Sequence, residues 1–170
     1  MPARITGKKS LAAVIGSVAA ASVLIAFVAR FEGLETTTYL DPVGVLTVCY
    51  GDTDPSMTIP GVTYTPEQCR DRLAERLVDY AVGVKRCTPG VFAVPEIAVP
   101  AIDLAYNIGV GAYCKSTAAA RFNAERWADG CEALTRYVYA RGKRLKGLEI
   151  RRGAEFEMCM RGAAKMGEIQ

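Results

Sequence analysis

The chain has 170 residues, with 21 basic and 18 acidic side chains and no histidine, a length that fits one compact catalytic domain with an appendage. Residues 1–30 hold four bases and no acid, which leaves 17 bases against 18 acids in the remainder. The remainder therefore lacks the basic stripe typical of nucleic-acid-binding domains, and we expect no nucleic-acid partner.

The first predicted element is an uncharged stretch over residues 10–29, which is long enough to span a bilayer. Lys8 and Lys9 favour a cytoplasmic N-terminus and export of the rest of the chain. The stretch is rich in Ala, Gly and Ser, so it should partition weakly. We therefore predict that residues 1–30 form a signal-anchor-release segment. A signal peptide cleaved near residues 19–21 and a permanent anchor are the alternatives.

Residues 31–64 are rich in Gly, Thr, Tyr, Val and Pro, and the β-like run at 43–48 predicts a small sheet or hairpin. Thr65 to Gln68 then form a capping box with proline at the first helical position, which predicts a long amphipathic helix. Prolines 89, 95 and 100 break this helix, and further helices are predicted at 101–107, 116–127, 131–141 and 148–161. The predicted fold class is α+β: a small lobe, a connecting helix and a helical lobe, with a cleft between the lobes.

All six cysteines follow the apolar stretch, and none forms a CxxC pair or stands with a histidine, so we expect no metal site. An even count behind an export-like leader indicates disulfides formed in an oxidising compartment such as the periplasm. Spacing alone leaves the pairing open. We expect a Cys49–Cys69 bridge in the hairpin-rich lobe and the other four within or between helices; six buried thiols in a cytosolic enzyme are the alternative. The cysteines are Cys49, Cys69, Cys87, Cys114, Cys131 and Cys159.

Glu32, Asp41 and Thr47 form an E-x8-D-x5-T array directly after the apolar stretch. Glycoside hydrolysis needs one carboxyl group that protonates the leaving oxygen and a second group that assists water or attacks the sugar. Glu32, in a short helix, would be the acid, and Asp41, in the following loop, would orient or activate a water held by Thr47. Alone, such spacing is weak evidence, because Glu, Asp and Thr are usually solvated surface groups or loop caps.

The surrounding motifs make the array specific. In order across residues 31–161, the chain resembles the T-even phage lysozyme family of endolysins, glycoside hydrolase family 24. With its leader it is similar to the signal-anchor-release endolysins of phages that infect Gram-negative bacteria. The motifs that carry the resemblance include Phe31-Glu32-Gly33, Tyr39-Leu40-Asp41, Leu46-Thr47-Val48-Cys49-Tyr50-Gly51, Tyr106-Asn107-Ile108-Gly109 and Arg151-Arg152.

The resemblance implies a lysozyme-like domain over residues 31–170 that cleaves the β-1,4 bond between N-acetylmuramic acid and N-acetylglucosamine in peptidoglycan, without a cofactor and as a monomer. The family triad carries onto Glu32, Asp41 and Thr47, and Asn107 would line the helical side of the cleft. Gly51 and Asp52 are further substrate-binding candidates. Relatives commonly have a histidine at position 52, which pairs with an acid; Asp52 cannot make that pair and would add a third carboxylate near the site.

The leader also suggests how activity is held off. While residues 10–29 are embedded in the host inner membrane, facing the periplasm after passage through the host export machinery, Glu32 would be pinned at the bilayer surface. Release into the periplasm would let residues 10–30 dock on the domain and bring Glu32 to Asp41 and Thr47.

Two other functions stay open from the sequence: a lytic transglycosylase, and a non-catalytic peptidoglycan-binding module with a membrane anchor. Some side chains have two interpretations as well. Arg151 and Arg152 either meet the cleft or solvate a helix. Trp127, Tyr137 and Tyr139 either stack on sugars or pack between helices.

Overall fold

A computed structural model of the chain describes residues 10–41 and 44–167. Lys8, Lys9 and Val43, on which parts of the predictions rest, lie outside this range. The helices and strands, in chain order, are α1 (Leu11–Ile15), α2 (Val18–Glu32), β1 (Glu35–Leu40), β2 (Leu46–Cys49), α3 (Pro66–Cys87), the 3-10 helix η1 (Pro89–Ala93), α4 (Pro95–Ile108), α5 (Val110–Cys114), α6 (Thr117–Asn123), α7 (Trp127–Leu134), β3 (Tyr139–Ala140), β4 (Lys143–Arg144) and α8 (Lys146–Lys165).

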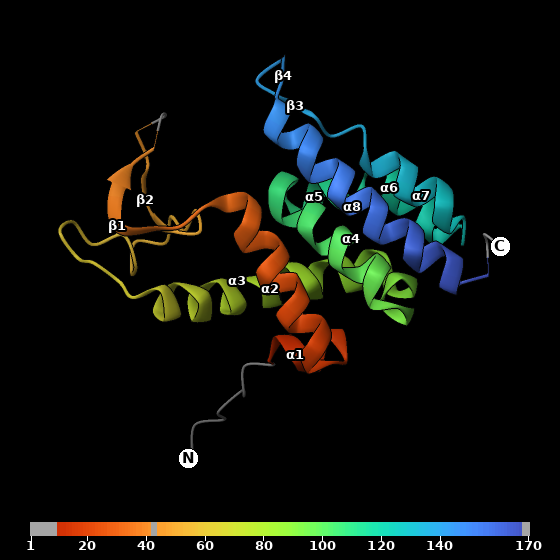
Figure 1. The fold of residues 1–170 in the computed structure, drawn as a ribbon, viewed down its shortest axis with the longest axis horizontal. Helices are drawn as coiled ribbons and strands as arrows, with labels where there is room; N and C mark the ends of the chain where they lie inside the picture. The colour runs from red at the N-terminus through yellow and green to blue at the C-terminus, as the bar shows by residue number, and fades with distance from the viewer. Residues whose placement is uncertain (1–9, 42–43, 168–170) are drawn as a thin grey trace, which may run out of the picture.

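The architecture has the two lobes that the sequence predicts. The β1–β2 hairpin stands at one end, and α3 runs from its neighbourhood into a group of helices in which α8 packs on α4 and α7 (Figure 1). Helix α2 crosses α3 and leads directly into β1 (Figure 1). The predicted α+β class, with a small sheet, a connecting helix and a helical lobe, is confirmed.

Helix α3 follows the predicted pattern closely. The Thr65 hydroxyl accepts a hydrogen bond from the Gln68 backbone N–H at 3.1 Å, and the Gln68 side chain accepts one from the Thr65 N–H at 2.8 Å. This capping box satisfies two N–H groups that a helix start leaves without partners. The apolar positions at helical spacing, from Cys69 to Val84, are buried against the core.

The leader, by which we mean the apolar stretch over residues 10–29, lies in two helices, α1 and α2, rather than in one. Gly16 ends α1 with a φ of 92°, a left-handed conformation that glycine adopts without strain. The Ser17 hydroxyl then caps α2 by accepting a hydrogen bond from the Ala20 N–H. Helix α1 packs on α3, and α2 packs on α3 and α4, with Leu24 and Val28 fully buried. In the described part of the chain, no helix combines the length and apolarity needed to cross a membrane.

The helical lobe departs from the predicted boundaries in several places. Helix α4 begins at Pro95 instead of residue 101, because proline is well suited to the first helical position, and Pro100 lies inside the helix. The helix predicted at 116–127 ends at Asn123, before Glu125 with its φ of 58°. The helix predicted at 131–141 ends at Leu134 and gives way to the β3–β4 hairpin.

The β3–β4 hairpin was missed for a local reason. Its turn is made by Arg141 and Gly142, whose φ values of 51° and 75° place both residues in the left-handed region. This pair of conformations matches the tight turns that connect antiparallel strands. Arginine is a poor signal for such a turn, so the sequence pattern favoured a longer helix.

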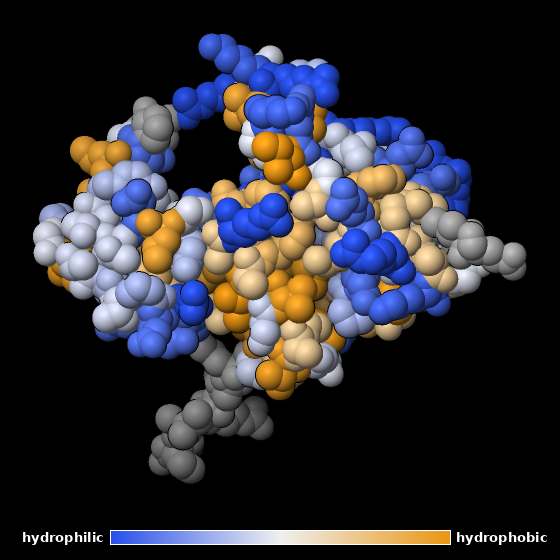
Figure 2. Space-filling model, viewed as in Figure 1, coloured by the Kyte–Doolittle hydropathy of each residue, from blue (hydrophilic) through white to orange (hydrophobic). Residues whose placement is uncertain are grey.

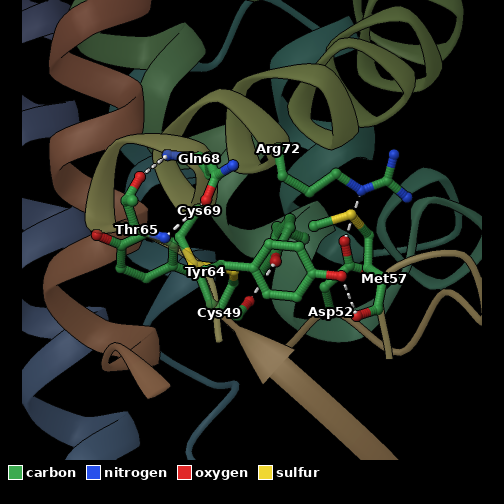
Figure 3. Close-up of a disulfide and its surroundings, with 10 residues drawn as sticks. Cys49, Asp52, Met57, Tyr64, Thr65, Gln68, Cys69 and Arg72 are labelled. Atoms are coloured by element: carbon green, nitrogen blue, oxygen red, sulfur yellow. Dashed lines mark hydrogen bonds and ion pairs between the residues drawn. A yellow bond between two sulfur atoms is a disulfide. The ribbon is translucent and has the colours of Figure 1, made fainter. Parts of the chain in front are cut away.

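Three disulfides tie the elements together: Cys49–Cys69 joins β2 to α3, Cys87–Cys114 joins α3 to α5, and Cys131–Cys159 joins α7 to α8. The first is the pairing expected from the sequence, and it fixes the hairpin lobe to the connecting helix (Figure 3). No cysteine among the described residues is free, unlike in the alternative of six buried thiols.

Candidate active site

Glu32 is the last residue of α2, at the junction of the two lobes. Its side chain is 22% exposed, and Oε1 accepts a hydrogen bond from Nη1 of Arg151 at 2.7 Å. Its other oxygen faces Gly51, where an added Cβ would lie 3.6 Å from Oε2. Gly51 has a φ of 73°, so a larger residue would be strained there. The carboxyl group is thus held from one side and open to solvent on another.

Asp41 and Thr47 lie on the β1–β2 hairpin. The Asp41 N–H donates to the Val45 carbonyl at 2.9 Å, and its Oδ1 accepts from the Val45 N–H at 2.8 Å. Thr47 is buried opposite Tyr39, and its hydroxyl donates to the same carbonyl at 3.1 Å. The turn therefore brings Asp41 and Thr47 together around Val45, while Glu32 comes from α2 and meets Gly51, just beyond the end of β2.

Arg151 of α8 meets the site and does not merely solvate its helix. It is nearly fully buried, and Nε and Nη2 donate to the two oxygens of Asp103 at 2.8 and 2.7 Å. Its Cζ lies 5.6 Å from the centre of the Phe31 ring. Burial opposes the charge of Arg151, but hydrogen bonds and charges of Asp103 and Glu32 outweigh it and raise the pKa of the guanidinium.

Arg152 and Glu155 lie next to Arg151 on α8. Both are buried, and Nη2 of Arg152 lies 2.6 Å from Oε1 of Glu155. Burial raises the pKa of Glu155 well above its ordinary value, and the facing carboxyl group of Asp103 raises it further. Burial also lowers the pKa of Arg152. Because an arginine does not lose its proton in proteins, we conclude that Glu155 is the neutral, protonated member of this pair.

Asp103 and Glu155 were not singled out from the sequence, although two signals point to them. Asp103 is the one acid in the buried run from Ile97 to Ala105 of α4, and a buried acid requires a partner. Glu155 follows Arg151 and Arg152 at spacings of four and three residues, which places them on one helix face.

Asp52 takes part in a hydrogen-bonded ion pair. Its Oδ2 accepts from Nε of Arg72 at 2.7 Å (Figure 3), and its Oδ1 accepts from the Asp54 N–H at 3.0 Å, so both oxygens are engaged. Arg76 adds a contact at 3.8 Å. The side chain at position 52 is therefore the acid of an ion pair whose base lies on α3. In the relatives, by the resemblance, position 52 would supply the base and another residue the acid.

The remaining candidates divide between surface and core. Asn107 is exposed at the end of α4, whereas its neighbour Tyr106 is half-buried and donates to the Tyr50 carbonyl at 2.9 Å. Trp127 is buried against Phe122, with ring centres 6.3 Å apart, so it packs between helices. Tyr139 is 60% exposed and stays available to a ligand.

The surface is hollowed between the β1–β2 hairpin and the β3–β4 end of α8 (Figure 2). A separate cavity of about 560 Å³ lies against α3, and residues 52–55, Arg72, Arg76, Asp79, Tyr80 and Val110 line it. Glu32, Asp41 and Thr47 are not among its lining residues. Within the described ranges, no group of three or more His, Cys, Asp or Glu side chains could hold a metal ion.

The chain is similar in sequence to known phage proteins. A sequence profile of the phage lysozyme family matches residues 29–155. The SAR-endolysin of Bacteriophage PS119 is 38% identical over 152 residues, covering 86% of this chain and 89% of its own. The SAR-endolysin of Enterobacteria phage P21 is 37% identical over 162 residues, covering 91% of this chain and 96% of its own.

Solved structures share the fold. An endolysin from Escherichia coli O157:H7 phage FAHEc1 superposes with a TM-score of 0.72 at 26% identity, covering 82% of this chain and 91% of its own. The active form of the P1 phage endolysin Lyz gives 0.72 at 22% identity, covering 89% and 92%. The secreted inactive form of the same endolysin gives 0.54 at 19% identity, covering 84% and 94%.

Proposed function

Because the chain belongs to the phage lysozyme family, we propose that Glu32, Asp41 and Thr47 are the residues with which it hydrolyses peptidoglycan. The protein is a phage endolysin with lysozyme activity, and its substrate is the cell wall of the bacterial host. The finer assignment, to the T-even branch and glycoside hydrolase family 24, rests on the motifs around these residues.

Glu32 is the proposed proton donor to the leaving oxygen. Its position is the observation that carries the proposal: it sits where the two lobes meet, fixed by Arg151 on one oxygen and open to solvent for about a fifth of its surface. A general acid needs both a fixed orientation and access to the substrate oxygen.

Asp41 and Thr47 are the proposed water-handling pair. The hydrogen bonds of both residues to Val45 fix them relative to one another at the hairpin turn. Asp41 would orient or activate the attacking water, and the Thr47 hydroxyl would hold it on the side of the sugar opposite Glu32. The glycan would lie in the hollow between the hairpin and α8.

Asn107 and Gly51 are the proposed substrate contacts. Asn107 is exposed on the helical side of the site, and Gly51 allows backbone and substrate to approach Glu32 closely. Asp52 is a further proposed substrate contact. Through Arg72 it anchors the loop after β2 to α3, which keeps Gly51 in place.

The leader is the proposed regulatory element. Residues 10–29 would first lie in the inner membrane after export and then, on release into the periplasm, fold against α3 and α4 as described. Three observations support this. The relatives are SAR-endolysins, α2 ends at Glu32 itself, and the fold is closer to the active than to the secreted inactive P1 endolysin. Membrane insertion and activity would then exclude one another.

The test is mass spectrometry of muropeptides released from purified Gram-negative peptidoglycan by the folded, released protein. We expect products with a reducing-end muramic acid from the wild type and none from Glu32→Gln. Anhydro-muramic acid would instead identify a transglycosylase. If Glu32→Gln kept full activity, the assignment of the proton donor would be wrong. Glu35→Gln, three residues further along and in strand β1, is the matched control and should stay active.

A further inference from the structure

A run of basic side chains surrounds the β3–β4 hairpin. Between Glu132 and Glu149 the chain has no acidic residue, and its basic residues are Arg136, Arg141, Lys143, Arg144 and Lys146. All of these basic side chains are exposed. Tyr139, which lies opposite Arg144 in the hairpin, is 60% exposed as well. We refer to residues 136–146 as the basic segment.

Much of the positive charge of the basic segment has no acidic partner within the protein. Glu149 pairs with Arg144 and with Lys146. Among the residues that the structure describes, no acidic side chain pairs with Arg136, Arg141 or Lys143. These cations therefore remain available to an anionic partner outside the chain.

The tip of the hairpin holds an arginine in an unfavourable conformation. Arg141 has a φ of 51°, in the left-handed region that residues with a side chain rarely adopt. Glycine or asparagine would make the same two-residue turn with less strain. Because Arg141 has no acidic partner among the described residues, the fold itself gives no reason for an arginine here. Strained residues of this kind are often found at binding sites.

The basic segment lies at the edge of the proposed glycan site. Helix α8 begins at Lys146, and five residues later Arg151 donates its hydrogen bond to Glu32. Five helical residues span about 7.5 Å, and the chain from Arg141 to Lys146 spans at most about 18 Å. The hollow in the surface lies between this end of α8 and the β1–β2 hairpin (Figure 2). An extended peptide of four or five residues covers about 13–18 Å, so a peptide on a sugar bound beside Glu32 can reach the basic segment.

The substrate carries charge of the matching sign. The glycan of peptidoglycan is neutral, whereas the short stem peptides on its muramic acid sugars carry free carboxylates. An anionic lipid surface is the other candidate partner. However, α1, which belongs to the leader, lies at the opposite end of the molecule from β3 and β4 (Figure 1). A membrane approached through the leader would therefore face away from the basic segment.

We propose that the basic segment binds the carboxylates of the stem peptides, with Arg141 and Lys143 as its main contacts. These two residues are substrate-binding residues and take no part in the chemical step. They would hold a peptide-bearing strand in the hollow while the bond beside Glu32 is cleaved. The inference rests on the proposed function, because it takes the glycan to lie in that hollow.

The experiment measures co-sedimentation of the full-length released protein with purified Gram-negative sacculi, with Glu32→Gln as the parent so that no cleavage occurs. The sacculi are used in native form and with their carboxyl groups converted to amides by a carbodiimide and ethanolamine. On native sacculi, Arg141→Gln with Lys143→Gln should bind about fivefold more weakly than the parent, the effect of two exposed ion pairs. On amidated sacculi the two proteins should bind equally. Lys115→Gln with Arg161→Gln, also exposed and equal in charge, should bind native sacculi like the parent.

Equal binding of the hairpin variant and the parent to native sacculi overturns the inference, and so does a loss of the same size on amidated sacculi. Should the variant not fold, the parent decides: it should bind native sacculi more tightly than amidated ones, and equal binding overturns the inference. A hairpin variant that loses binding only to phosphatidylglycerol vesicles would assign the segment to a lipid surface instead. Muropeptide release that depends on Glu32, together with equal sacculus binding, would leave the proposed function standing and remove only this inference.

Discussion

Lys85 of α3 donates a hydrogen bond from Nζ to the backbone carbonyl of Val14 at 3.0 Å, across 71 positions of sequence. Val14 belongs to the last turn of α1, where helix carbonyls lack partners within the helix. A lysine at this end also faces the negative pole of the short helix. The contact therefore ties the start of the leader to the body of the enzyme.

Replacing Lys85 with Met should loosen the leader without disturbing the rest of the fold. The lost hydrogen bond corresponds to about 1 kcal/mol, and the apolar stem of the side chain is kept. Limited proteolysis should cut the leader of Lys85→Met faster than that of the wild type. Lys115→Met, an exposed change away from the leader, should not alter the rate. Equal cleavage rates in all three proteins would show that this hydrogen bond does not stabilise the packing of the leader on the domain.

Truncating Leu24 to Ala should destabilise the folded enzyme strongly. Leu24 is fully buried where α2 packs on the domain, and removal of a buried leucine side chain typically lowers the free energy of unfolding by about 2–5 kcal/mol. The neighbouring Val23→Ala, at a position 46% exposed, should change it by less than about 1 kcal/mol. Urea unfolding measures both. Similar values for the two variants would mean that α2 does not pack as described.

Arg72→Gln should lower stability more than removal of an exposed partner. Without Arg72, the buried Asp52 carboxylate loses its main partner, and breaking a buried ion pair from one side lowers stability by about 3–5 kcal/mol. Glu75→Gln removes only a half-exposed contact to the same arginine and should change little. Urea midpoints compare the two. A small effect of Arg72→Gln would indicate that Arg76 takes over the pairing.

The Cys131–Cys159 bridge closes a segment of 28 residues between α7 and α8. Chain-entropy arguments give about 3–4 kcal/mol for a loop of this length. The double variant Cys131→Ser with Cys159→Ser should lose about this much, measured by denaturant unfolding under oxidising conditions. Under reducing conditions the variant and the wild type should converge, since neither then carries the bridge. A persistent difference after reduction would point to packing rather than to the bridge.

Stability should fall as the pH rises through the mildly acidic range, because of Glu155. Burial raises its pKa in the folded state, so above the ordinary glutamate value of 4.5 the folded protein binds a proton that the unfolded chain has released. The unfolded state then binds fewer protons, and the free energy of unfolding decreases with pH up to the raised value. Glu155→Gln should flatten this slope in urea titrations at several pH values. An unchanged slope would assign the pH dependence to other groups.

Much of the fold could be predicted because local signals coincide with it. The capping box at Thr65 and the apolar spacing from Cys69 to Val84 both predict α3, and the structure has both. The predicted helix boundaries were wrong where the backbone conformation of a single residue ends a helix or reverses the chain. Glu125 and Arg141 take left-handed conformations that glycine or asparagine would signal better, so the break after α6 and the β3–β4 hairpin were not foreseen.

The site was predictable in part for a similar reason. Glu32, Asp41 and Thr47 stand close together in sequence, within an ordered array. Asp103 and Arg151 are 48 positions apart, and only the packing of α8 on α4 brings them together. The reversed pair of Asp52 and Arg72 needs the same kind of long-range information. Sequence motifs were enough to propose the reactive groups, whereas the partners of Glu32 and Asp52 in hydrogen bonds and ion pairs depend on tertiary contacts.

The end of α2 at Glu32 constrains how the leader can evolve. Each residue of an α-helix turns by about 100° and advances by about 1.5 Å. One residue inserted between Val28 and Glu32 would swing the carboxyl group away from Arg151, whatever the hydrophobicity of the new side chain. Deleting one residue would rotate the carboxyl group in the opposite direction and would also move it away from Arg151. Substitutions on the exposed face of α2 are therefore tolerable, but changes of length near its end are not.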